Sequence, residues 1–246
     1  MMIRDVDFNL RTLRKMKQAR VVWPKGDEFE HFSRMMQSRE DLITNRFGVV
    51  DGTHFNIAVP WSSDDQSVYY NGWTATHDVT CLFVWTPDGC ISYSKVNIPG
   101  ICHDSHNASE LYQMLLDERI TPREYGILGD SAFKMSPKLW RPFKRNEWGK
   151  ISDDQYMTAC QLHAQIVSLR QIAEWGNRSL KGSFARLYLP LSWDCEKRAQ
   201  LLEVCVRLLN LRTRIIGSSQ IRTVFANACV SQRYGFDRVC YYYGIL

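Results

Sequence analysis

The chain of 246 residues carries 31 Lys and Arg against 26 Asp and Glu, and its formal net charge is +5. This length suits one large domain or two small ones with a sizeable core, and the mild basic excess permits a polyanionic partner without requiring one. No apolar run approaches the roughly 18 residues of a transmembrane helix, and the first residues lack a signal-peptide pattern, so neither feature is expected.

The eight cysteines include no Cys-x-x-Cys pair and lie mostly in apolar segments. In a chain without a secretion signal, this usage predicts small, reduced core residues rather than disulfides. Cys160 and His163 have the spacing of a zinc-ligand pair, but no second pair follows at finger spacing. Structural zinc is therefore not expected.

The N-terminal region is predicted to be helical. Residues 11–20 form a basic cluster that could contact phosphates or act as a nuclear address, although a solvated helix face is the more common explanation. A short helix is predicted over residues 27–37, with Phe29, Phe32 and Met36 on one face.

Residues 47–57 predict a central strand that carries a carboxylate, Asp51, in its middle. Gly52 follows it and would let another group approach the backbone. A carboxylate inside a strand is costly to bury unless it is paired or binds a cation. Asp51 is therefore either a salt-bridged or turn-capping residue, or part of a cation site.

Two further strands follow a predicted loop at residues 60–70. Residues 76–85 are strongly β-forming, and residues 90–98 alternate between apolar and polar side chains. A Thr-Pro-Asp-Gly turn at residues 86–89 joins them, because Pro presets φ and Gly accepts a positive φ. The first three strands are therefore expected to be antiparallel, with the Asp51 strand at the centre.

A second carboxylate, Asp130, follows the short apolar strand predicted at residues 125–129. Ligands gather at the carboxyl ends of strands that connect through helices, so Asp130 is either a site residue or a helix cap. Before this strand, Asp104 either caps a helix over about 106–118 or contributes to a site. His103 either supports such a site or forms a local hydrogen bond.

Residues 137–150 mix aromatic and basic side chains, among them Lys144 and Arg145. Such a surface suits single-stranded or distorted nucleic acid, through base stacking and phosphate neutralisation. The alternative is that the aromatic side chains are core residues and the cations are merely solvated.

The longest helical pattern covers residues 153–184, and a last helix is predicted over 194–215 and ended by Gly217. One flank of the longer helix carries Glu174 at helical spacing from three cations, Arg170, Arg178 and Lys181. This flank is either an exposed ion-pair ladder or a third metal-binding carboxylate with cations ready for phosphates.

Three carboxylates on separate elements, Asp51, Asp130 and Glu174, have a clear chemical use together. Two divalent cations about 3.5–4 Å apart need shared oxygen ligands, and such a pair activates the attacking oxygen and stabilises the leaving one. Nearby cations offset the phosphate charge of the transition state.

Four segments, in order, resemble the PIF/Harbinger-type DDE transposases. They are residues 48–54 (GVVDGTH), 99–105 (PGICHDS), 128–133 (LGDSAF) and 170–176 (RQIAEWG). Residues 173–178 (AEWGNR) and 182–187 (GSFARL) are most similar to versions from fungal elements. The resemblance extends over about residues 20–225, but the usual N-terminal helix-turn-helix region is missing from it, and Ile101 stands where the family commonly has a small residue.

The resemblance implies an α/β, RNase H-like fold with a five-stranded mixed sheet flanked by helices. It implies a DDE triad of Asp51, Asp130 and Glu174 that binds two Mg²⁺ or Mn²⁺ ions. Supporting residues would be His54, His103 and Asp104, and phosphate-binding residues would be Lys144, Arg145, Arg170, Arg178 and Lys181. The expected division is an N-terminal helical segment (1–40), a catalytic domain (41–216) and a C-terminal tail (217–246).

The implied activity is DNA cleavage at element ends followed by strand transfer, in the nucleus, or in the cytoplasm without a partner. Expected partners are DNA, a separate Myb-like DNA-binding protein and further copies of the chain. Two alternatives stay open: a domesticated or truncated DNA- or protein-binding module without catalysis, and a ribonuclease of the same fold, which RNA–DNA hybrids would reveal.

Overall fold

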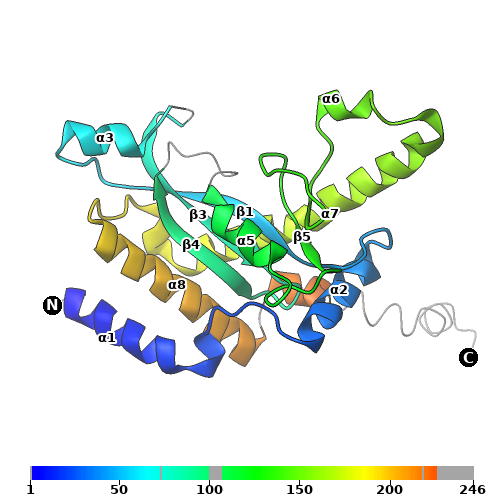
Figure 1. Ribbon diagram of the computed structural model, residues 1–246. Helices are drawn as coiled ribbons and strands as arrows, with labels where there is room; N and C mark the ends of the chain where they lie inside the picture. Colours follow the sequence, from blue (N-terminus) through cyan, green and yellow to red (C-terminus); the bar gives the residue numbers. More distant parts are fainter. Residues whose placement is uncertain (1, 73, 100–106, 218, 226–246) are drawn as a thin grey trace, which may run out of the picture.

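The computed structural model describes residues 2–72, 74–99, 107–217 and 219–225. Helices and strands alternate along the chain (Figure 1), in the order α1 (Met2–Lys15), η1 (Lys17–Ala19), α2 (Asp27–Arg39), β1 (Arg46–Asn56), α3 (Ser63–Tyr69), β2 (Tyr70–Asn71), β3 (Thr76–Trp85), β4 (Ile91–Pro99), α5 (Ser109–Leu116), β5 (Gly126–Leu128), β6 (Leu139–Trp140), α6 (Arg145–Trp148), α7 (Asp153–Ser183), η2 (Ala185–Tyr188) and α8 (Cys195–Ile216). No helix among these residues is long and apolar enough to span a membrane.

The sheet is mixed and has β1 at its centre. The strand order is β2-β3-β1-β5-β6, and β4 also pairs with β3. The strands β1, β3 and β4 pair antiparallel, as predicted, whereas β5 and β6 extend the sheet in parallel. The predicted count of five strands is wrong, because the sheet has six. Both β2 and β6 have only two residues, which is too short for a recognisable alternation.

Helices cover both faces of the sheet (Figure 1). On one face α7 packs against β1 and β3, α8 packs against β4 and α7, and α1 packs on the outer side of α8. Side chains of α5 cover the other face. Because both faces of β1 are buried, its apolar residues serve two cores: Val49 and Phe55 face α7 and α8, whereas Val50 faces α5.

The long helices match their predictions closely, because each has a periodic apolar face and clear end signals. The carboxylate of Asp194 caps α8 by accepting hydrogen bonds from two backbone N–H groups, and Gly217 ends the helix with a φ of 71°. A buried amide ties α8 to the rest of the fold. Asn210 bonds both backbone groups of Ile91 at 2.8 Å and donates to the Arg20 carbonyl at 3.0 Å.

Two local predictions need correction. Residues 60–70 are not all loop, because α3 forms over Ser63–Tyr69. The Ser62 side chain caps this helix, and acidic residues in its first turn favour the positive end of the helix dipole. The helix predicted over 106–118 is shorter, because α5 covers only Ser109–Leu116.

The described cysteines are all free thiols, as predicted. Three of them, Cys81, Cys90 and Cys205, are buried, and burial raises the pKa of Cys81 and of Cys205 to about 12. The predicted C-terminal tail starts inside the fold, because residues 220–225 are helical and place Ile221 and Phe225 in the core. Residues 226–246 lie outside the described part of the chain.

Candidate active site

Two of the predicted carboxylates lie at the same level of adjacent parallel strands. In the register of β1 and β5, Val49 pairs with Leu128. Asp51 and Asp130 each follow two residues later. Neighbouring strands are about 4.8 Å apart, so this register, if continued past the end of β5, would bring the two aspartates to the same level of the sheet.

Asp51 belongs to the face of the sheet that α7 covers. Side chains alternate along a strand, and Val49 and Leu128 pack in the core shared with α7 and α8. A Cβ on Gly129 would lie 3.2 Å from a methyl group of Val50, on the opposite face. The same alternation, if continued from Leu128, would point Asp130 the same way as Asp51.

A hydrogen bond joins Asp51 to α7 directly. The Asn177 Nδ2 group donates to Asp51 Oδ2 at 2.9 Å, and both residues are partly buried. The other half of this amide is unusual, because Asn177 Oδ1 is buried and has no hydrogen-bond partner among the described residues. A buried polar atom without a partner costs about 1–3 kcal/mol, so this oxygen requires an explanation.

A close approach between helix and sheet makes this hydrogen bond possible. Gly176 lies against the indole of Trp85, and a Cβ at this position would come within 2.6 Å of three ring carbons. Trp85 pairs with Val49 on β1. The missing side chain therefore lets the backbone of α7 approach the sheet next to Asp51.

Glu174 lies on the same helix, one turn before Asn177, and its side chain is exposed. Residues three apart on a helix are neighbours on its surface, so Glu174 and the Asp51 contact share one side of α7. Among the described residues, however, no group of three or more His, Cys, Asp or Glu side chains is placed to hold a metal ion. The structure thus ties Asp51 to α7 through Asn177, while the side chain of Glu174 is open to solvent.

The carboxylate of Asp130 also has a local role. Its Oδ1 atom accepts a hydrogen bond from the backbone N–H of Ala132 at 2.8 Å, within a turn at residues 131–133. The predicted alternative of a helix cap is therefore replaced by a turn cap, because no helix follows β5 directly. One oxygen of Asp130 is engaged in this way.

The predicted supporting residues do not gather with the aspartates in the described structure. His54 is an odd number of residues from Asp51 and so projects from the opposite face. Its Nδ1 atom lies 3.2 Å from Thr80 Oγ1 and 3.6 Å from Asp78 Oδ1. Asp78 is fully buried, and the structure identifies it as the carboxylate behind His54. His103 and Asp104 lie outside the described residues.

The cations predicted on α7 differ in exposure. Lys181 is partly buried: its Nζ atom donates to the His54 carbonyl at 3.0 Å and lies 5.1 Å from the Phe55 ring centroid. Burial lowers the pKa of Lys181. Arg178 is exposed and Arg170 is partly buried. Lys181 therefore supports the strand of Asp51, whereas Arg178 is open to solvent.

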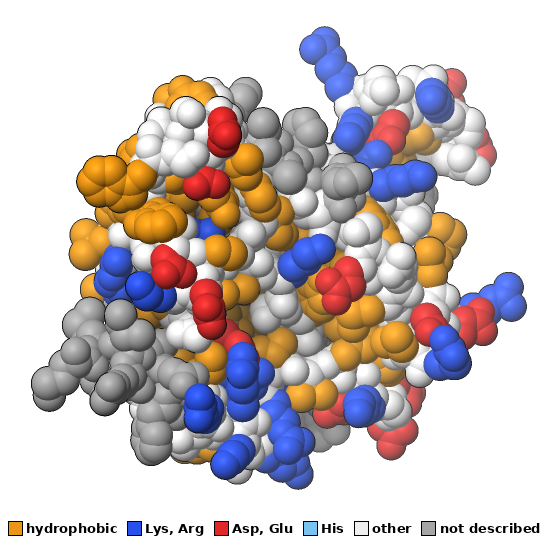
Figure 2. Space-filling view, turned by 60° about the vertical axis from the view of Figure 1, so that its left-hand side comes forward, with side chains coloured by type: hydrophobic (Ala, Val, Ile, Leu, Met, Phe, Trp, Pro, Cys, Tyr) orange, Lys and Arg blue, Asp and Glu red, His pale blue; other side chains and the backbone are white. Residues whose placement is uncertain are grey.

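The basic and aromatic region forms an arm made of α6 and the first half of α7, which projects beyond the sheet (Figure 1). Both predicted alternatives apply in part. The aromatic rings of Phe143 and Trp148 pack together and against His163, whereas Lys144 and Arg145 are exposed. In Figure 2 the arm is the lobe at the upper right, and Lys and Arg side chains protrude from it beside acidic ones.

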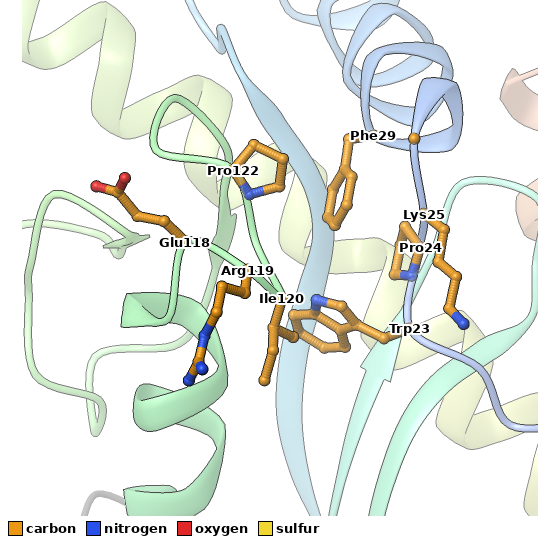
Figure 3. A pocket seen from close by; sticks show the side chains of 9 residues that line it. Trp23, Pro24, Lys25, Phe29, Glu118, Arg119, Ile120 and Pro122 are labelled. Carbon is orange, nitrogen blue, oxygen red and sulfur yellow. The ribbon is translucent and has the colours of Figure 1, made fainter.

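A pocket of about 490 Å³ lies elsewhere, between the start of α2 and the segment after α5. Figure 3 shows Trp23, Ile120 and Phe29 along its wall, with Glu118 directed away from Phe29. Trp23 and Phe29 pack in the core on the α5 side of the sheet. This pocket is therefore separate from the α7 side of the sheet, where Asp51 lies.

The atoms at the aspartate edge suit a hard divalent cation. Carboxylate and amide oxygens are the ligands that Mg²⁺ and Mn²⁺ prefer. Asp51 and Asp130 supply carboxylates, and the buried Asn177 Oδ1 is an oxygen acceptor without a partner among the described residues. Sequence reasoning missed Asn177, although its position three residues after Glu174 was a usable signal.

A model of a family described as DDE superfamily endonuclease matches residues 50–210, which is more than half of the chain. The matched range contains Asp51, Asp130, Glu174 and Asn177. No curated protein and no solved structure matches this sequence.

Proposed function

Because the chain belongs to the DDE superfamily of endonucleases, we propose that it is a divalent-metal-dependent DNA endonuclease and transposase of the PIF/Harbinger type, similar to fungal elements. The observation that supports this proposal is the parallel register of β1 and β5, in which Val49 pairs with Leu128 two residues before Asp51 and Asp130, together with the hydrogen bond that ties Asp51 to α7. The catalytic domain would be residues 41–216, with an RNase H-like fold.

In this proposal Asp51, Asp130 and Glu174 are the oxygen ligands of two Mg²⁺ or Mn²⁺ ions. When bound, these ions supply activation of the attacking water or 3′-hydroxyl and stabilisation of the leaving oxygen. Asp51 is held by α7 through its hydrogen bond with Asn177. Glu174 lies one helical turn before Asn177 on α7 with an exposed side chain, and it would supply the third carboxylate.

DNA is the proposed substrate, and exposed cations at two places support it. Arg178 lies one residue after Asn177 on α7, close to the proposed cleavage site, and Lys144 and Arg145 lie on the arm. Such cations neutralise backbone phosphates and so add affinity that does not depend on sequence. We further propose action in the nucleus, as an oligomer of this chain, with a separate Myb-like protein that recognises the element ends.

Cleavage assays with carboxylate variants test the proposal. Asp51→Asn, Asp130→Asn and Glu174→Gln should each reduce Mn²⁺-dependent nicking of a DNA duplex by more than about 100-fold, because each removes a ligand charge without changing volume. Asp64→Asn, on the remote helix α3, is the matched control and should nick at the wild-type rate. Nicking that persists in all three variants, in preparations free of other nucleases, would refute the assignment.

The same proteins separate the alternative functions. A non-catalytic binding module would bind DNA equally with and without divalent metal, and its binding would survive all three substitutions. A ribonuclease would cleave an RNA–DNA hybrid in preference to duplex DNA, because only the hybrid presents 2′-hydroxyl groups.

A further inference from the structure

The side-chain amide of Asn177 has a hydrogen bond at its nitrogen, whereas its oxygen has no partner among the described residues. Its Nδ2 group donates to Asp51 Oδ2 at 2.9 Å. A carboxylate only accepts hydrogen bonds, so Asp51 fixes which end of the amide faces it. The amide oxygen is consequently directed elsewhere, where it is buried and lacks a partner among the described residues.

Packing alone does not account for an asparagine here. A leucine has the same number and branching of side-chain heavy atoms and would bury no unpaired oxygen, whereas the asparagine leaves one in a partly buried position. In native structures such an atom is explained by a catalytic role or by a water molecule or ion bound there. The location supports this use, because Asn177 touches Asp51 and follows Glu174 by one helical turn.

We propose that Asn177 completes the divalent-cation site, with its NH₂ group orienting Asp51 and its amide oxygen serving as an additional oxygen ligand. This inference rests on the proposed function, because it assumes that Asp51 binds a cation. A neutral amide is suited to the position. An aspartate there would place two carboxylates within hydrogen-bond distance and add repulsion before any cation arrives.

The amide also differs from the cations around it. Lys181, one turn further along α7, donates to a backbone carbonyl of β1 and lies outside this contact. A lysine or arginine at position 177 would pair with Asp51 and compete with a metal ion for its oxygens. Asparagine instead holds the carboxylate and leaves its negative charge in place, which favours cation binding.

The test measures Mn²⁺ binding to the full chain without DNA, from the electron paramagnetic resonance signal of free Mn²⁺. Asn177→Leu should weaken Mn²⁺ affinity by about 10–100-fold. Asn177→Asp keeps an oxygen ligand but loses the NH₂ donor that orients Asp51, so its Mn²⁺ affinity should fall clearly less than that of Asn177→Leu. Asn146→Leu, at an exposed asparagine on α6, is the matched control and should bind as the wild type does.

The outcomes distinguish this inference from the function on which it rests. If Asp51→Asn abolishes Mn²⁺ binding while Asn177→Leu binds normally, Asn177 is not part of the site and this inference alone is wrong. Equal losses in Asn177→Leu and Asn177→Asp would reject the ligand role, because only orientation of Asp51 would then matter. If Asp51→Asn binds Mn²⁺ as the wild type does, the proposed function and this inference fail together.

A folding defect is separated by measuring each variant in the absence of metal. The circular dichroism spectrum and thermal midpoint of Asn177→Leu should match those of the wild type without Mn²⁺, and the upward shift of the midpoint on adding Mn²⁺ should be smaller than in the wild type. An equal shift in both proteins would contradict the inference even if cleavage were lost.

Discussion

The approach of α7 to the sheet depends on Gly176, and replacing it with alanine tests the geometry of the site. In Gly176→Ala the new methyl group would lie 2.5 Å from Cε2 and 2.6 Å from Cε3 of Trp85, and closer still to Cδ2. Carbon atoms in contact are normally about 3.5–4 Å apart. Trp85 is only 1% exposed and so has little room to move. The helix must therefore move away from β1.

The expected cost follows from two opposing effects. Overpacking a core typically destabilises a protein by about 1–3 kcal/mol, and the upper half of this range applies because the contact is with a rigid ring. Alanine gains about 1 kcal/mol over glycine in a helix. We therefore expect Gly176→Ala to destabilise the fold by about 1–2 kcal/mol, which lowers the melting temperature by about 2–8 °C in a chain of this size.

Gly182→Ala provides the matched control on the same helix. A Cβ at Gly182 would meet nothing within 4 Å, so only the helix-propensity gain remains, and this variant should be as stable as the wild type or slightly more stable. Urea unfolding measures both. DNA nicking should also fall in Gly176→Ala, because Asn177 and Glu174 move away with the helix. Equal stability of the two variants would refute the reasoning.

Three further predictions concern the arm and the core. The Arg141 guanidinium, together with the Lys144 N–H, lowers the pKa of Glu147 from 4.5 to about 2, so Glu147 contributes stability that is present above pH 4.5 and lost as the pH falls toward 2. Urea unfolding at pH 6 and pH 3 should therefore differ less for Glu147→Gln than for the wild type. Asn210→Ala removes the buried hydrogen bonds to both backbone groups of Ile91 and should cost about 2 kcal/mol or more in urea unfolding; an unchanged midpoint would contradict this. Replacing Lys144 and Arg145 with glutamate should weaken DNA binding and reduce its salt dependence by up to about 0.9 log unit per lost phosphate contact, and an unchanged slope would exclude the arm from the DNA interface.

Much of the fold could be predicted because its main elements carry strong local patterns. The strand around Asp51 has apolar residues on both faces, as expected for a central strand with parallel and antiparallel neighbours. The β3–β4 turn has Gly89 at a φ of 82°, as its sequence predicted. The helices α7 and α8 follow their apolar periodicity almost to the residue.

The incorrect predictions concern helices and strands that are short or that depend on a single side chain. The strands β2 and β6 exist only because neighbouring strands offer backbone partners. The helix α3 has no buried residue and is fixed mainly by its Ser62 cap. Neither kind of element leaves a hydrophobic pattern in the sequence.

The sequence predicts the three carboxylates of the candidate site, but not the contact that holds Asp51 against α7. Asp51 and Asn177 are 126 residues apart in the chain, and their hydrogen bond depends on how closely α7 approaches the sheet. That distance is set by Gly176 against Trp85, a pair that no local pattern links. Helical spacing identifies Glu174 as a residue on one flank of α7. Only the packing of α7 against the sheet shows that its neighbour Asn177 contacts Asp51.

His54 is the opposite case. Its place in the motif suggests a role beside Asp51, but its position on the strand contradicts a direct role there. The two residues are three positions apart, and side chains an odd number of positions apart project from opposite faces of a strand. There His54 meets the buried carboxylate of Asp78, one of whose oxygens has no hydrogen-bond partner among the described residues. The other oxygen of Asp78 accepts hydrogen bonds from Asn71 Nδ2 and Thr74 Oγ1 at 3.1 Å each. His54 therefore acts on the stability of the sheet, and any effect on the aspartates must pass through the backbone of β1.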